Sequence, residues 1–370
     1  MTQVAIPRPA PAAREESVES VESADPAMSW QPLVVIRPDD NPDRVCLSDP
    51  LQGQRATVRL DALLDLLTRP TGASPAGRRL AQALRDRGWW PARPLDPAVM
   101  AALTRWWTRG WHPSLGYYLW SRHRRQVDLA DGDGAVRRRV LKQYTVDGPL
   151  PPRIVITGDP IGLPDASPLP DTALGDVLMA RRTVRGYAPA PVDVRILGDL
   201  LHHGLSDVRA IRDLALDDEL QLLRSHGTPF EFYVANYRAE GLAPGIYHYH
   251  IQRHTLTPVN LGDHRPRMAR ILLGMRAPET AAWTLVIVGD FAQYQWRYRH
   301  ERALRHLYMA VGRIAQRLIV VGHTYGLGSL PTPAMLDLDC CDLLGIDAET
   351  HAPVYSLTLG PAPEPKETRS

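Results

Sequence analysis

Two periods of hydrophobic and polar positions run through this chain, and they are clearest in its second half. Residues 301–321 carry the strongest helical period. Apolar side chains recur there three or four residues apart, at Leu304, Leu307, Val311, Ile314 and Leu318. A near-continuous apolar run at 283–289 predicts a buried central strand. Shorter alternating or apolar runs predict further strands at 229–235, 245–250 and 353–360.

Helical patterns stand between and before these strands, at 172–179, 192–201 and 265–273. The strands and helices mix without a regular strand-helix-strand alternation. This order predicts an α+β sandwich for the second half of the chain.

The first half has a simpler pattern of short strands followed by helices. Residues 33–36 and 55–60 are expected to form strands. Helices are expected at 61–67 and then after Ser74, which is a favoured residue for capping a helix. Strand, strand, helix, turn and helix within about 60 residues are compatible with a small winged-helix-like module. A further helix is expected from Asp96 onward.

Changes in composition divide the chain into five segments. Residues 1–28 are rich in Pro, Ala, Glu and Ser and are expected to be a disordered tail. Residues 29–146 are assigned to the winged-helix-like module with a helical extension. The Pro- and Gly-rich segment 147–171 is expected to be a linker. The second domain is assigned to 172–362, and 363–370 to a C-terminal tail.

Composition and charge narrow the function classes. The chain of 370 residues carries 43 basic and 41 acidic residues. Its net charge of +2 is too small to favour binding to nucleic acid or to an anionic membrane. Its three cysteines show no metal-binding spacing, and a reducing cytoplasm is expected. No apolar run is long enough to span a membrane, and the N-terminus lacks the features of a signal peptide.

A cluster of cationic and hydroxyl side chains follows the helix predicted at 172–179. It consists of Arg181, Arg182, Thr183 and Arg185. Guanidinium forks and a short hydroxyl donor are suited to binding a phosphate if the segment turns there. A solvated basic turn would have the same composition, so the residues alone leave both interpretations open.

A second cluster, Trp296-Arg297-Tyr298, stands at the predicted start of the long helix. A tyrosine beside a cation suits proton transfer, because the cation favours the tyrosinate form. A surface helix start with one packed tryptophan explains the same residues equally well. Three histidines at 248, 250 and 254, in and after the strand predicted at 245–250, lack a carboxylate or cysteine at ligand spacing, so no metal site is expected.

Several motifs in order make the chain from about 173 to 362 similar to the FMN-dependent nitroreductase superfamily. Within it, the chain resembles the SagB-type dehydrogenases of peptide natural-product pathways. The matching segments are Arg181-Arg182-Thr183-Val184-Arg185, Pro229 to Tyr233, Gly245 to Tyr249, Arg297-Tyr298, Gly312 to Gln316 and Gly326-Leu327-Gly328. Two positions depart from the family pattern: Thr228 replaces a histidine, and Arg297 replaces the lysine of a Lys-Tyr pair.

The resemblance implies an FMN site and assigns residues to it. Arg181, Arg182, Thr183 and Arg185 would contact the FMN phosphate and ribityl chain. Ser225 and His226 would lie in a turn that approaches the flavin. Gly328, Ser329 and Leu330 would face the isoalloxazine ring, and Lys366 would add charge near the phosphate.

The resemblance also implies an activity and partners. The expected reaction is oxidation of a ribosomally synthesised peptide, such as azoline to azole, with hydride transfer to flavin N5 and proton removal assisted by Tyr298. An arginine stays charged, so Arg297 would give electrostatic support, or else the substrate is not an azoline. The expected partners are a peptide bound through its leader segment, other peptide-modifying enzymes and a second copy of the chain. Two alternatives remain: a generic NAD(P)H-dependent nitro- or ene-reductase, and a flavin-free peptide-binding scaffold.

Overall fold

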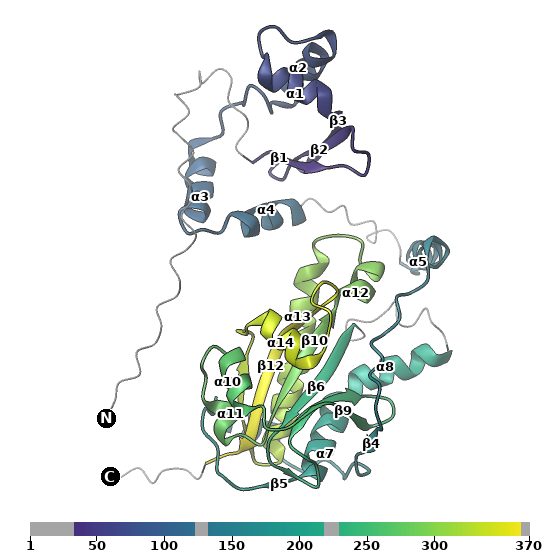
Figure 1. Ribbon diagram of the computed structural model, residues 1–370, viewed down its shortest axis with the longest axis vertical. Coiled ribbons are helices and arrows are strands. Elements are labelled where there is room, and N and C mark those ends of the chain that lie inside the picture. Colours follow the sequence, from purple (N-terminus) through teal and green to yellow (C-terminus); the bar gives the residue numbers. More distant parts are fainter. Residues whose placement is uncertain (1–32, 123–131, 218–228, 364–370) are drawn as a thin grey trace, which may run out of the picture. The chain divides into compact units, whose positions relative to one another are not determined.

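A computed structural model of the chain describes residues 33–122, 132–217 and 229–363 (Figure 1). The chain divides into two compact units, one up to residue 125 and one from residue 126. Among the described residues, no helix is both long and apolar enough to cross a membrane.

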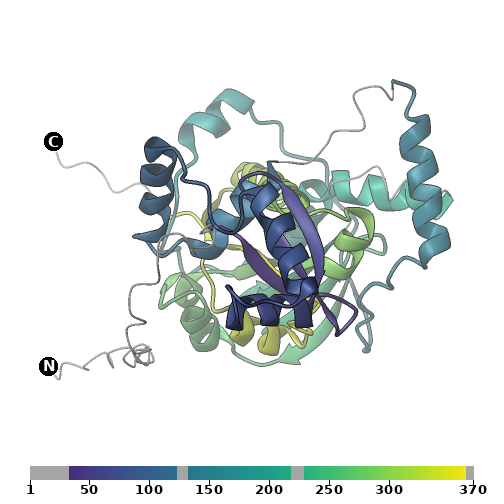
Figure 2. The same cartoon turned by 90° about the horizontal axis from the view of Figure 1, so that it is seen from above.

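The N-terminal unit contains a small antiparallel sheet with helices beside it. Its strands lie in the order β1 (Val35–Pro38), β2 (Arg44–Asp49) and β3 (Gln54–Arg59). The helices are α1 (Leu60–Thr68), α2 (Pro75–Arg87), α3 (Pro97–Trp107) and α4 (His112–Ser121). In both views α1 and α2 lie next to the sheet, with which they share a hydrophobic core (Figures 1 and 2).

Helix α2 begins where its predicted capping residue stands, whereas Asp61, the predicted cap of the first helix, lies inside α1. Ser74 caps α2, because its side chain accepts a hydrogen bond of 3.1 Å from the backbone nitrogen of Gly77. Strands precede helices in the predicted order, with β2 as an additional strand. Likeness to a winged-helix module stays a prediction.

The second unit is built on a seven-stranded sheet. Every neighbouring pair of strands in it is antiparallel, and the order is β11-β12-β10-β6-β8-β9-β4. These strands are β4 (Ile161–Gly162), β6 (Phe230–Asn236), β8 (Gly245–His250), β9 (Thr255–Leu261), β10 (Trp283–Asp290), β11 (Leu327–Thr332) and β12 (His351–Pro361). A separate parallel pair joins β5 (Val192–Asp193) to β7 (Ala239–Glu240).

Helices cover both faces of the large sheet. The longest, α13 (Ala303–Thr324), packs beside α7 (Val194–Gly204) on one face. The other face carries α10 (Arg265–Ile271), α11 (Ala277–Thr280) and α14 (Asp337–Leu344). Among the described residues, this unit also contains α5 (Ala135–Asp147), α6 (Leu174–Ala180), α8 (Ser206–Asp217) and α12 (Phe291–Arg297).

Strand β10 shows why its sequence is apolar at nearly every position. Successive side chains of a strand point to opposite faces of the sheet. Leu285 and Ile287 therefore enter one hydrophobic core, while Val286 and Val288 enter the other. All eight residues of β10 are buried. The predicted α+β architecture is confirmed.

The predicted division of the chain differs from the structure in the middle. Helix α5, predicted to extend the N-terminal module, belongs to the second unit because it packs against α12. The segment 147–171, predicted to be a linker, also contributes β4, which pairs with β9 at the edge of the large sheet. This segment is therefore part of the second unit's structure.

The structure also corrects the position of Arg297-Tyr298. The pair does not begin the long helix: Arg297 is the last residue of the short helix α12, and Tyr298 follows it. The chain then turns, and α13 begins only at Ala303. The pair thus closes one helix instead of opening the next.

Candidate functional site

The segment Arg181–Arg185, called the arginine segment, lies directly beside β11, although about 145 residues separate the two in sequence. Thr183 forms an isolated parallel bridge with Ser329. The backbone nitrogen of Val184 donates a hydrogen bond of 2.9 Å to the carbonyl oxygen of Ser329. The structure therefore brings together two groups of residues that the family resemblance assigned to one cofactor.

Tyr187 connects the arginine segment to the large sheet through hydrogen bonds. Its hydroxyl donates to the carbonyl oxygens of Val184 at 3.0 Å and Thr358 at 2.7 Å. The side chain is buried, and burial raises the pKa of Tyr187, so the hydroxyl stays protonated as a donor. Sequence reasoning missed this residue, which follows the last arginine of the cluster by two positions.

Gly328 is required by the close approach of the two segments. A Cβ atom at this position would lie 2.8 Å from Cβ and from Cγ2 of Val184. The next two side chains, Ser329 and Leu330, are 3% and 4% exposed. The role of Gly328, Ser329 and Leu330 beside a flavin ring stays a prediction.

The four predicted phosphate ligands differ in how they are engaged. Arg182 turns back, and its Nη1 donates to the carbonyl oxygens of Met179 at 2.7 Å and Arg181 at 2.9 Å. Arg181 is half-buried, whereas Thr183 and Arg185 are exposed. Within the described part of the chain, the guanidinium groups of Arg181 and Arg185 have no hydrogen-bond or ion-pair partner. These two cations are available for an anion, and Arg182 also closes the end of α6.

The predicted catalytic pair has a different environment. The guanidinium carbon of Arg297 lies 5.0 Å from the ring centre of Tyr298, which places the cation over the aromatic face. Tyr298 packs against the hydrophobic core and against the ring of Tyr294, with ring centres 4.8 Å apart. The cation and the phenol are adjacent, as the predicted role of the pair requires.

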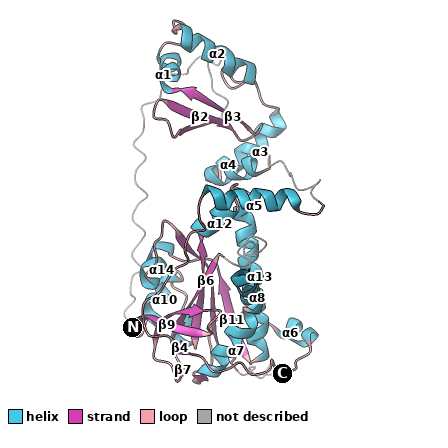
Figure 3. Cartoon of the chain, turned by 90° about the vertical axis from the view of Figure 1, so that its right-hand side faces the viewer, coloured by secondary structure: helices cyan, strands magenta, loops and turns pink. Residues whose placement is uncertain are grey.

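The arginine segment and the pair nevertheless stand at opposite ends of the sheet. Ser329, beside the arginines, pairs with Leu359, whereas Asp290, before α12, pairs with His351. At about 3.3 Å per residue, the eight residues between these positions on β12 span about 26 Å. Figure 3 shows α6, which leads into the arginine segment, far from α12 along the sheet. One copy of the chain does not bring the two clusters together.

A buried ionic cluster occupies the α12 end of the sheet. It is centred on Glu231, which is 2% exposed. Three side chains contact its carboxylate oxygens: Arg153 Nη1 at 2.8 Å, Arg212 Nη2 at 3.5 Å and His248 Nε2 at 3.0 Å. Sequence reasoning placed Glu231 in a family motif but did not predict this cluster, because its partners come from three distant segments.

The charges around Glu231 keep its carboxylate ionised. Burial raises the pKa of Glu231, but the charge of Arg212 and the hydrogen bond with His248 outweigh that effect. The charge of Arg153 acts in the same direction, so the pKa of Glu231 is held well below its usual range. The carboxylate therefore remains ionised and fixes the Arg153 and Arg212 side chains at the end of the sheet.

The other predicted site residues have separate outcomes. Ser225, His226 and Lys366 lie outside the described residues. His248 contacts Glu231, and Nδ1 of His254 lies 2.8 Å from the hydroxyl of Tyr249. Over 33–122, 132–217 and 229–363, no group of three His, Cys, Asp or Glu side chains is arranged to hold a metal ion.

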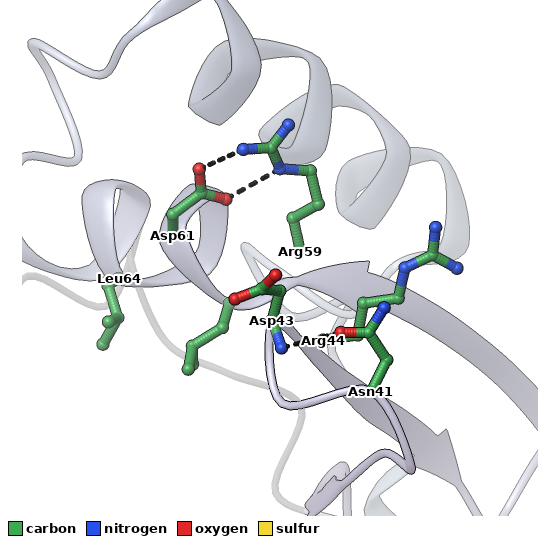
Figure 4. A pocket seen from close by; sticks show the side chains of 7 residues that line it. Asn41, Asp43, Arg44, Arg59, Asp61 and Leu64 are labelled. Carbon is green, nitrogen blue, oxygen red and sulfur yellow. Dashed lines mark hydrogen bonds and ion pairs between the residues drawn. The ribbon is translucent and has the colours of Figure 1, made fainter.

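A pocket of about 510 Å³ lies in the N-terminal unit, where β2 and β3 meet the start of α1 (Figure 4). Its lining residues are Asn41, Asp43, Arg44, Arg59, Leu60, Asp61 and Leu64. Arg59 Nε donates to Asp61 Oδ1 at 2.9 Å. The pocket therefore presents both signs of charge next to exposed leucine surface, a lining suited to a mixed polar and apolar segment.

Comparison with known proteins adds the family to this geometry. The sequence profile of the nitroreductase family matches residues 178–361. These residues form a nitroreductase-family domain. The match includes the arginine segment, β11 and the Arg297-Tyr298 pair, and the predicted nitroreductase-like α+β fold is confirmed.

Two relatives match about half of the chain. The trifolitoxin operon protein TfxC of Rhizobium leguminosarum bv. trifolii is 26% identical over 197 residues, which cover 50% of this chain and 54% of TfxC. A protein of Methanocaldococcus jannaschii named as a nitroreductase is 27% identical over 190 residues, which cover 50% of this chain and 89% of that protein. The chain thus spans about half the length of TfxC.

Solved structures include a protein from Anabaena variabilis that is named as a nitroreductase. It is 24% identical with a TM-score of 0.44, and the match covers 51% of this chain and 38% of that one.

Proposed function

We propose that the chain is an FMN-dependent dehydrogenase that acts in the maturation of a ribosomally synthesised peptide. The observation that carries this proposal is the pairing of the arginine segment with β11 through Thr183 and Ser329. It places available cations next to a backbone stretch that Gly328 keeps in close contact with Val184. The nitroreductase family of this domain supports an oxidoreductase.

The side chains at this end of the sheet fit an FMN phosphate. Arg181 and Arg185 would bind the phosphate through charge-assisted hydrogen bonds, and the exposed hydroxyl of Thr183 would add a donor. Backbone atoms of Gly328 and Ser329 would line the site. Bound FMN would supply the two-electron chemistry by accepting a hydride. Ser225, His226 and Lys366 remain proposed contacts.

Tyr298 is the proposed proton acceptor for the substrate. Its phenol is flanked by Arg297, whose guanidinium group lies over the aromatic ring. Because arginine keeps its proton near neutral pH, Arg297 would act only through its charge. Whether the substrate is an azoline depends on how well this arrangement replaces a lysine-tyrosine pair.

A second copy of the chain would bring the two ends together. Asp290, from which the helix before Tyr298 begins, stands about 26 Å along the sheet from Ser329 beside the arginines. Helices α6 and α13 contact each other and expose apolar residues, a surface suited to a homodimer interface. These residues are Leu174, Leu178, Met179, Tyr308 and Met309. We infer that Tyr298 of one protomer serves the FMN held by the arginines of the other.

A peptide substrate is supported by the relative and by the N-terminal unit. The name of TfxC places that protein in the operon for trifolitoxin, so a related biosynthetic role is proposed here. Among the described residues, the outer edges of β1 and β3 have no neighbouring strand. An extended leader segment can pair with such an edge, and other peptide-modifying enzymes would act on the same peptide.

The visible absorption spectrum of the purified full chain tests the cofactor. Flavin bands, retained through gel filtration or restored by added FMN, are expected. A colourless protein that cannot be reconstituted with FMN would favour a flavin-free scaffold and reject the proposal. Rapid bleaching of the bound flavin by NADPH would instead support a generic nitro- or ene-reductase.

A further inference from the structure

The short helix α12 is bound along one side by the segment that precedes the large sheet. Residues 144–153, called the strap, include the last turn of α5 and the first part of the predicted linker. Three side chains in and just after α12, spaced three residues apart, bind the strap in antiparallel order. They are Gln293 Nε2 to the Pro151 oxygen at 3.0 Å, Trp296 Nε1 to the Gly148 oxygen at 3.1 Å and Arg299 Nη1 to Asp147 Oδ2 at 2.7 Å.

Aromatic contacts strengthen the α5 end of the strap. The guanidinium carbon of Arg299 lies 3.8 Å from the ring centre of Tyr144, a close cation–π contact. Tyr144 also meets Trp296 edge to face, with ring centres 6.2 Å apart. One tyrosine of α5 therefore contacts both residues that flank Arg297-Tyr298.

The strap is fixed at its other end to the interior of the sheet. Arg153 Nη1 donates to Glu231 Oε1 at 2.8 Å, and Glu231 is itself buried. Helix α12 is also held at its first turn, because Asp290 Oδ1 accepts a hydrogen bond of 2.9 Å from the Gln293 nitrogen. The strap thus runs from α5, along α12, to the buried ionic cluster.

The opposite side of α12 carries the tyrosines. The hydroxyl of Tyr294 donates to the carbonyl oxygen of Ala303 at 2.9 Å. The Tyr298 nitrogen donates to the Tyr294 oxygen at 2.8 Å, and Tyr298 packs on the core. Helix α12 is held between the core and the strap, so rotation of the helix would break contacts on both sides.

We propose that the strap is the element that positions Tyr298 and that Tyr144, Asp147, Trp296 and Arg299 are positioning residues. The inference rests on the role proposed for Tyr298. Trp296 and Arg299 lie on either side of the Arg297-Tyr298 pair and are both bound by the strap.

The test observes Tyr298 directly in the full chain. Protein labelled with 3-fluorotyrosine is recorded by ¹⁹F NMR, and the signal missing from Tyr298→Phe is assigned to Tyr298. We expect this signal to shift or broaden in Asp147→Ala and in Trp296→Phe. Hydrogen exchange, read by mass spectrometry, is expected to speed up at the backbone amides of Tyr298 and His300.

A second ion pair provides a matched control. Asp207 binds Arg317 at 2.7 Å, the same distance as in the Asp147–Arg299 pair, and both pairs lie at the surface. Asp207→Ala should leave the Tyr298 signal and the exchange of its amide unchanged. The double variant Asp147→Arg with Arg299→Asp, which reverses the ion pair, should restore the signal at least in part.

Two results separate the failure of this proposal from the failure of the proposed function. A Tyr298 signal and amide exchange that stay unchanged in both Asp147→Ala and Trp296→Phe would overturn the positioning role. That conclusion needs no substrate and no flavin. Full dehydrogenation by Tyr298→Phe would instead reject the catalytic role of Tyr298, and the positioning result would then describe a packed residue.

Discussion

The two ends of the large sheet differ in whether their charged side chains have partners. At the arginine end, Arg181 and Arg185 have no ionic partner within the described residues, and Arg185 is exposed. At the α12 end, Glu231 is buried and its charge is matched by two arginines and a histidine. An available cation can bind an incoming anion, whereas a satisfied ionic cluster holds protein segments in place. The comparison separates a binding end from a positioning end.

The largest effect is expected at Tyr298. Tyr298→Phe removes the phenolic oxygen but keeps the ring that packs on the core, so folding and FMN retention should be unaffected. Loss of a positioned proton acceptor lowers turnover by roughly 10²–10⁴-fold. Oxidation of an azoline-containing peptide, followed by mass spectrometry, measures this loss. Unchanged turnover would remove Tyr298 from the mechanism.

Mixed dimers show whether the two ends work across protomers. A protomer with Arg185→Ala is combined with a protomer that carries Tyr298→Phe. The assay is run at an FMN concentration that loads the parent but not Arg185→Ala, so that each variant alone is inactive. If each site takes its arginines from one copy and its tyrosine from the other, the mixed dimer contains one native site and regains activity. If the residues act within one copy, the mixture stays inactive, which would contradict the shared site.

The next effect concerns the buried ionic cluster. Glu231→Gln would leave Arg212 buried without its counter-charge, which costs about 3–5 kcal/mol of unfolding free energy. Urea denaturation measures this loss. Arg59 and Asp61 form an exposed pair, and Asp61→Asn should cost far less. A small loss in Glu231→Gln would mean that water replaces the carboxylate and that the cluster does not stabilise this end.

The same residue predicts a dependence of stability on pH. The folded-state pKa of Glu231 is lowered, so its contribution is fully present above the unfolded value of 4.5. As the pH falls below that value, Glu231 is protonated in the unfolded chain but stays ionised in the folded chain, so the free energy of unfolding declines. The decline should be shallower in Glu231→Gln. Equal slopes for the two proteins would contradict the lowered pKa.

A smaller effect is expected for the arginine end, and it appears in binding. Arg185→Ala removes one charge-assisted contact with the FMN phosphate and should weaken FMN binding by about 1.5–3 kcal/mol. Fluorescence titration with FMN measures the change. Riboflavin, which lacks the phosphate, should bind the variant and the parent equally. An equal loss for riboflavin would place Arg185 away from the phosphate.

The contact between Gly328 and Val184 predicts a modest loss of stability. Gly328→Ala would place its Cβ 2.8 Å from the valine side chain and force the arginine segment away from β11. Overpacking of this kind costs roughly 1–3 kcal/mol. Thermal unfolding measures it. The double variant with Val184→Ala should recover part of the loss, and no recovery would show that another contact is responsible.

Local periodicity accounts for most of the predicted secondary structure. The apolar run of β10 and the helical spacing of α13 predict their elements well, because each pattern continues along the whole element. The break between α12 and α13 was missed because residues 298–302 contain neither glycine nor proline. That break is set by tertiary contacts, including the hydrogen bond from Tyr294 to Ala303.

The candidate site was predictable only in part. The arginine cluster is contiguous in sequence, so its composition alone suggested an anion site. Its contact with Gly328 and the cluster around Glu231 join segments that are distant in the chain, and no local pattern encodes such contacts. The assignment of α5 to the N-terminal module was wrong for the same reason, since Tyr144 finds its partners more than 150 residues later.

The strap changes where this protein can be cut or recombined. The family match begins at residue 178, yet β4 and the contacts of Asp147, Gly148 and Pro151 all lie upstream of it. A chimera joined at the family boundary would keep the arginine end but lose the support of α12. An exchange of N-terminal units that preserves the enzyme would place its junction before Ala135, where α5 begins.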